Sequence, residues 1–326
     1  MHSSKTLIKC IAFCIVLVLC SAFMTFILYP WSSLNRHFLG YHNETENIDF
    51  LILGNSLENN GINPKIISEE FNCHAYKFTP QGSYPESLYY LLIDVLSTHN
   101  VKTLLVGWDI IQNFQNPPYI YPHSEELYRE FIVDFPKSWE LTCLTLKNIM
   151  AQRYTSTFFK WSSFPENILE IPDVLKSKQN KDCTTPNTTA EILSNKPENP
   201  KFPADFNKVV YERKYTPVIQ PNDKEYLLKI KQRCKKENIR LYVLSCAIPE
   251  SIQKALPEMA DFIKISADFM KENDITYINT SDSIHFPGGT DDYNFKDCFG
   301  HYNAWYMNTY TQQICNFIKS ANDRTD

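Results

Sequence analysis

Short apolar, β-rich runs alternate with helical stretches over most of this chain, and this alternation restricts the fold more than any other feature. The runs are residues 49–53, 75–78, 102–108, 240–246 and 275–279. Apolar residues at helical spacing lie between them, for example Leu88, Leu91, Leu92 and Val95. Strands that alternate with helices pair in parallel through right-handed crossovers. We therefore predict an α/β fold with three layers and a central parallel sheet of about five strands.

Helix signals accompany several of these runs. A helical pattern begins at about residue 63, two more cover about 223–238 and 257–271, and a last amphipathic helix begins at about residue 304. The sequence Ser83-x-x-Glu86 has the form of a capping box and predicts a helix start.

The connection between the third and fourth runs, about residues 112–221, is too long for a simple α/β crossover. Its first part is aromatic, and residues 176–208 are rich in Asn, Pro, Thr and Lys. We predict an insertion that forms a lid over the carboxyl ends of the strands, where open α/β sheets bind their ligands.

Residues 10–29 carry no charged side chain, and about 20 apolar helical residues span a hydrocarbon core. Lys5 and Lys9 precede this run, and Tyr29 and Trp31 follow it. The positive-inside rule then leaves residues 1–9 in the cytoplasm and the body outside. We predict a single-pass protein of the cytoplasmic membrane, with a stalk at 30–48 and an α/β domain at 49–326. A cleaved signal peptide and lipidation at Cys20 are the alternatives.

Composition excludes several functions. The net charge of −5 does not provide the basic surface that nucleic acids require, so we expect no nucleic-acid partner. Seven of the ten cysteines follow the apolar run, and none of them forms a C-x-x-C pair. We therefore expect neither a metal site nor a cofactor.

Ser56 is the principal candidate for chemistry. It follows an apolar run directly, in Gly54-Asn55-Ser56, and a turn from strand to helix can expose a hydroxyl group beside free backbone N–H groups. A turn residue or helix cap is the structural alternative for such a serine.

Asp297 and His301 supply what a serine nucleophile lacks. Both lie in a predicted turn between the last strand and the last helix. A serine needs a base to take its proton, and the base needs an acid to orient it. Ser56, His301 and Asp297 are thus a candidate catalytic triad.

These residues and their order resemble the SGNH (GDSL-like) hydrolase superfamily. Gly54-Asn55-Ser56 matches its first block, and the continuation LENNGINP is similar to membrane-anchored SGNH-like proteins. Gly82 lies where the family has an oxyanion-hole glycine, and Asp297 with His301 is the nearest match to its D-x-x-H block. The resemblance implies a flavodoxin-like sandwich and an oxyanion hole formed by the N–H groups of Ser56 and Gly82.

The chain departs from the family pattern at two places. The spacing from Asp297 to His301 is D-x-x-x-H, one residue longer than usual, so a loop bulge must restore the geometry. Asp109 follows the third strand where the family has an oxyanion-hole Asn, and an ionised carboxylate cannot donate a hydrogen bond. Asn113 is the remaining candidate donor if the loop turns back.

The resemblance implies ester hydrolysis or acyl or acetyl transfer on an envelope glycan or another acylated polymer outside the membrane. The similar proteins include the D-alanyl transfer protein and SGNH proteins that work with membrane-bound O-acyltransferases. The alternative is a non-catalytic SGNH-like module that binds a glycan or an O-acyltransferase partner.

Overall fold

The computed structural model describes residues 2–28, 40–41, 44–80, 83–115, 169, 171–172, 175–176 and 202–322. The predicted insertion lies mostly between residues 116 and 201, so the lid stays a prediction about residues outside the described ranges. The division into tail, anchor, stalk and domain also stays a prediction.

The five predicted strands form one parallel sheet. They are β1 (Phe50–Leu53), β2 (Ala75–Phe78), β3 (Thr103–Gly107), β4 (Arg240–Ser245) and β5 (Thr276–Asn279). Their order is β2-β1-β3-β4-β5, and every neighbouring pair is parallel. This arrangement confirms the predicted α/β fold.

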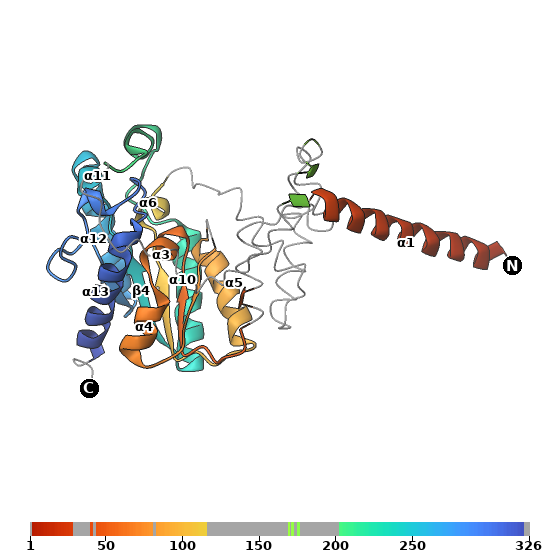
Figure 1. Cartoon of the computed structure of the whole chain (residues 1–326), viewed down its shortest axis with the longest axis horizontal. Helices are drawn as coiled ribbons and strands as arrows, with labels where there is room; N and C mark the ends of the chain where they lie inside the picture. Colours follow the sequence, from red (N-terminus) through yellow and green to blue (C-terminus); the bar gives the residue numbers. More distant parts are fainter. Residues whose placement is uncertain are drawn as a thin grey trace.

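Helices cover both faces of the sheet, which gives three layers (Figure 1). One face packs against α5 (Pro85–Leu96), α10 (Pro221–Glu237) and α12 (Met259–Glu272). The other packs against α4 (Pro64–Phe71) and α13 (Ala304–Asn322). Side chains of β1 alternate between the two cores, with Leu51 and Leu53 in the first and Phe50 and Ile52 in the second.

Short helical segments lie near the carboxyl ends of the strands. They are α3 (Ser56–Gly61), α6 (Ile110–Asn113), α11 (Glu250–Ala255), the π-helical η4 (Lys208–Glu212) and the 3₁₀-helical η5 (Asp292–Asn294). The helix α3 is additional to the helices that the hydrophobic pattern predicts, because six residues are too few to show a 3.6-residue period.

The predicted capping box at Ser83 is wrong. The helix α5 begins at Pro85, its N-cap is Tyr84, and no side chain caps it. The Ser83 hydroxyl group donates to the carbonyl oxygen of Pro80 instead. Proline at the first position of a helix has no N–H group and already has a helical φ. The start of α5 therefore has one fewer N–H group that needs an acceptor.

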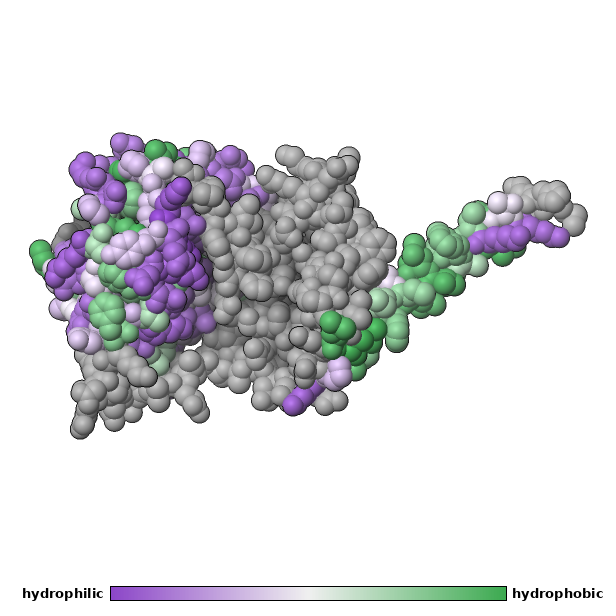
Figure 2. Space-filling view, turned by 90° about the horizontal axis from the view of Figure 1, so that it is seen from above, coloured by the Kyte–Doolittle hydropathy of each residue, from purple (hydrophilic) through white to green (hydrophobic). Residues whose placement is uncertain are grey.

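The apolar N-terminal run forms α1 (His2–Leu28), of which Lys5–Met24 is long and apolar enough to cross a membrane. Apolar side chains cover most of its length (Figure 2), and residues 5–20 are exposed. These properties fit a signal anchor and a signal peptide equally well.

Candidate active site

The turn after β1 is held by a capping box. Asn55 caps α3, and its side-chain oxygen accepts a hydrogen bond from the N–H of Leu57 at 2.8 Å. The Glu58 carboxyl group accepts from the N–H of Asn55 at 2.8 Å. These bonds place Ser56 at the first position of the helix, where backbone N–H groups have no partner within the helix. Within the described ranges, the Ser56 N–H donates to no acceptor.

The loop that carries His301 is closed at its base. Phe295 and Tyr302 pair as an antiparallel bridge, and their buried rings stack with centroids 4.4 Å apart. The Tyr302 hydroxyl group donates to the carbonyl oxygen of Gly289 at 2.8 Å. A closed base limits how far residues 296–301 can move away from the sheet.

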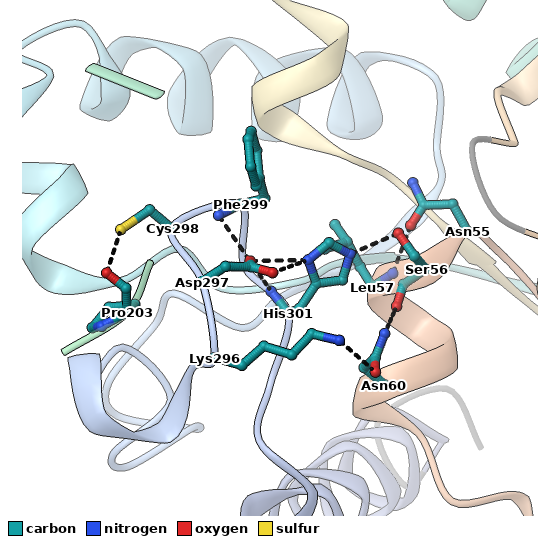
Figure 3. Close-up of polar contacts among 10 residues, drawn as sticks. All are labelled: Asn55, Ser56, Leu57, Asn60, Pro203, Lys296, Asp297, Cys298, Phe299 and His301. Atoms are coloured by element: carbon teal, nitrogen blue, oxygen red, sulfur yellow. Dashed lines mark hydrogen bonds and ion pairs between the residues drawn. The ribbon is translucent and has the colours of Figure 1, made fainter. Parts of the chain in front are cut away.

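Ser56, His301 and Asp297 lie in hydrogen-bond contact, as Figure 3 shows. His301 Nε2 is 2.7 Å from Ser56 Oγ, and His301 Nδ1 is 2.9 and 2.8 Å from the two oxygens of Asp297. With the imidazole proton on Nδ1, the ring donates to Asp297 and its other nitrogen can accept the Ser56 proton. The structure therefore brings together the three residues that were predicted from the sequence as a candidate catalytic triad.

Gly300 accommodates the longer D-x-x-x-H spacing. Its φ is +103°, a conformation that L side chains rarely adopt. A Cβ atom there would also lie 3.0 Å from the carbonyl oxygen of Ala247. The chain folds back so that Asp297 Oδ1 also accepts from the N–H groups of Phe299 and His301, at 3.1 and 3.3 Å. This is the bulge that the spacing requires.

Gly82 and Asn113 are the two oxyanion-hole donors that were predicted in addition to Ser56. Gly82 lies outside the described residues. Asn113 is the last residue of α6 and is buried, and its Nδ2 has no hydrogen-bond partner in the described part of the chain. No hydrogen bond between described residues joins Asn113 to Ser56, so its role stays a prediction.

Two carboxyl groups lie beside the Ser56 turn, the buried Glu58 and the partly buried Asp109. Burial raises the pKa of Glu58 to about 7, although the N–H of Asn55 opposes the shift. Burial also raises the pKa of Asp109, which caps α6 and accepts from Gln112 at 3.1 Å. The amide nitrogen of Asn55 lies 3.5 Å from the Asp109 carboxyl group.

The described ranges contain neither a metal-binding cluster nor a disulfide. No group of three or more His, Cys, Asp or Glu side chains there could hold a metal ion. The eight cysteines that are described are free thiols, including the buried Cys234, Cys246, Cys298 and Cys315.

Sequence reasoning missed Glu58 and Gly300. Asn55-x-x-Glu58 has the capping-box form, so the start of α3 could have been found. The burial of Glu58 and the φ of Gly300 have no sequence signal of their own.

Comparison with known proteins adds a distant structural likeness. No protein-family model matches the sequence, and no curated protein matches it. A crystal structure described as a "putative acylhydrolase" from Bacteroides fragilis is similar, at 10% sequence identity and a TM-score of 0.43. The alignment covers 90% of this chain and 98% of that chain. This likeness is too distant to support a conclusion about activity. Any such conclusion rests on the geometry of the site.

Proposed function

We propose that this chain is a serine esterase or O-acyltransferase of the SGNH type that acts on an acylated glycan or polymer of the cell envelope. The observation that carries the proposal is the 2.7 Å contact between Ser56 Oγ and His301 Nε2, with His301 Nδ1 held by Asp297. The structural alternative, a serine that only caps a helix, gives no reason for this contact across 245 residues of sequence.

The proposed reaction begins when Ser56 Oγ attacks the acyl carbonyl carbon and His301 Nε2 takes the hydroxyl proton. The tetrahedral intermediate then expels the alcohol, which takes that proton from His301, and the acyl group stays on Ser56. Water or a sugar hydroxyl attacks next, with His301 again as base, and restores free Ser56. Asp297 stabilises the imidazolium ion that forms in each half-reaction.

The Ser56 N–H is the proposed first donor to the oxyanion, since it has no acceptor in the described ranges. Gly82 and Asn113 are the proposed additional donors. Each donor of this kind lowers the barrier by about 3–4 kcal/mol where it has been measured in another enzyme. Hydrolysis and transfer differ only in the acceptor of the acyl group.

The helix α1 supports the proposed location outside the cytoplasm. An anchor or signal sequence would take the α/β domain across the cytoplasmic membrane, where acylated glycans are the proposed substrates. A membrane-bound O-acyltransferase is the proposed partner if the reaction is a transfer, because the sequence resembles SGNH-like proteins that work with such enzymes.

Labelling with a fluorophosphonate probe tests the proposal, since such probes react only with activated serines. The full-length protein in detergent should be labelled, and Ser56→Ala should not. Ser281→Ala is the matched control, because Ser281 follows the carboxyl end of β5 and should keep its labelling. Failure of the folded wild-type protein to react would refute the catalytic proposal.

A non-catalytic module that binds a glycan or an O-acyltransferase is the second candidate. Asp109 favours it, because a carboxyl group occupies the strand end where the family has a donor. Retention of the folded, unlabelled protein on immobilised envelope glycan would support this second function.

A further inference from the structure

Glu58 is a carboxyl group that the proposed mechanism does not use, although it lies two residues from Ser56. Its side chain is 1% exposed. Buried carboxyl groups are costly unless they are well paired, so an acid in this place requires an explanation.

Two glycines leave the space that Glu58 occupies. A Cβ atom on Gly54, at the end of β1, would lie 2.3 Å from Glu58 Oε2, and one on Gly107, at the end of β3, would lie 2.3 Å from Glu58 Cδ. Neither glycine has a positive φ. Glycine at these two positions therefore leaves space for the Glu58 side chain. It is not required by the backbone conformation.

The Glu58 carboxyl group links three elements. One oxygen accepts from the N–H of Asn55, the residue before Ser56. The other lies 3.4 Å from Sγ of Cys246, which follows β4. The Tyr310 hydroxyl group lies 3.5 Å from the same sulfur, so the contacts continue to α13, the helix that follows His301. The contacts of Glu58 thus run from the Ser56 turn to the helix that follows His301.

We propose that Glu58 is a positioning residue for Ser56: its carboxyl group, seated over Gly54 and Gly107, fixes the turn that presents the Ser56 hydroxyl group to His301. This inference rests on the proposed function for its kinetic consequences, but its geometric claim is independent of it. Glu58 does not touch the reacting atoms, and it acts through the N–H of Asn55.

The shape of the carboxyl group matters more than its charge in this role. Glu58→Gln retains an oxygen that can accept from Asn55, so it should keep close to the wild-type rate. Glu58→Ala leaves the buried N–H of Asn55 without an acceptor. A displacement of about 1 Å at a reacting atom costs on the order of a hundredfold in rate.

The test measures the rate constant for covalent reaction and the reversible binding constant of the fluorophosphonate probe with the full-length protein in detergent. Glu58→Ala should lower the rate constant about a hundredfold and leave the binding constant nearly unchanged, and Glu58→Gln should restore the rate. Asn63→Ala is the matched control, because Asn63 is the buried N-cap of the neighbouring helix α4. It should lower stability without slowing the reaction.

A double-mutant cycle tests the fit to the glycines. Gly107→Ala should slow the reaction in the wild-type background, because its Cβ atom would displace Glu58. The same substitution should have little further effect in Glu58→Ala, where the space is empty. Additive losses would overturn the proposal, as would a wild-type rate in Glu58→Ala or an equal loss in Glu58→Gln.

Crystal structures of the wild type and of Glu58→Ala separate this inference from the proposed function. We expect the Ser56 Oγ to His301 Nε2 distance to exceed hydrogen-bond length only in the variant. If the wild type does not react with the probe but the variant shows this separation, positioning stands and catalysis fails. If the contact is unchanged in the variant, positioning fails even where the wild type reacts.

Discussion

Asp297 and His301 are four residues apart, and both carboxyl oxygens of Asp297 lie within 2.9 Å of Nδ1 of His301. The backbone between them turns at Gly300, whose φ is +103°. The same carboxyl group accepts from the N–H groups of Phe299 and His301. The acid is therefore oriented by its own loop, and the extra residue in the D-x-x-x-H spacing is absorbed by one glycine.

Replacing this glycine should disrupt the loop. Gly300→Ala forces a side chain into a left-handed conformation, which costs about 1–3 kcal/mol, and we expect it to slow probe labelling sharply. Gly288→Ala is a matched control because Gly288 also has a positive φ, of 73°, but lies outside the Asp297–His301 loop. Thermal unfolding should show destabilisation in both variants, larger for Gly300→Ala because its Cβ atom would lie 3.0 Å from the carbonyl oxygen of Ala247. Equal labelling rates in both would contradict the role of Gly300.

Removing the charge of Asp297 should slow probe labelling strongly while the protein stays folded. Asp297→Asn cannot stabilise the imidazolium ion, and the corresponding change in another serine enzyme lowers the rate by about 10⁴. We expect a loss on the order of 10³ to 10⁴ in the rate of probe labelling. Asp292→Asn is the control from the same segment, where Asp292 accepts from the N–H of Ser251. A small loss in Asp297→Asn would show that His301 does not depend on this acid.

Burial of Glu58 should make stability depend on pH in a defined window. Its pKa is 4.5 ordinarily and about 7 in the folded protein. Between these values the unfolded chain has lost the proton that the folded chain keeps, so stability falls as pH rises, by about 1.4 kcal/mol per unit. The total loss is about 3 kcal/mol.

Glu58→Gln removes this titration. We therefore expect the free energy of unfolding of the variant minus that of the wild type to rise from pH 4.5 to 7 and to stay constant above pH 7. Denaturant unfolding at several pH values measures this difference. Asp223, whose pKa burial also raises to about 7, affects both proteins equally and cancels in the comparison. A difference that stays constant across the window would show that Glu58 is not buried in solution.

The N-terminal helix predicts the behaviour of the protein in membrane fractionation. The full-length chain should sediment with membranes and resist carbonate extraction, because Lys5–Met24 is apolar and none of its side chains is buried in the protein. A chain that begins at Asn35 should be soluble and should keep a cooperative unfolding transition. Mature protein in the soluble fraction without residues 1–29 would identify a cleaved signal peptide instead.

Local sequence patterns were sufficient for the strands and the long helices of this fold. The strand at 75–78 and the helix that begins at Ala304 have the predicted starts, because the apolar periodicity of a buried strand or amphipathic helix is written in neighbouring residues. Ser56 was nominated for the same reason, since it directly follows a buried strand. The strand order β2-β1-β3-β4-β5 was not predicted, because the handedness of parallel crossovers does not fix which strands are neighbours.

The tertiary structure alone decided what surrounds Ser56. Its contact with His301 joins residues 245 apart, and the place of Glu58 depends on the ends of three strands that meet only after folding. A glutamate followed by two asparagines gives no local signal of burial, because burial depends on neighbours from other elements. The φ of Gly300 is likewise set by the ends of its loop, which Phe295 and Tyr302 hold together.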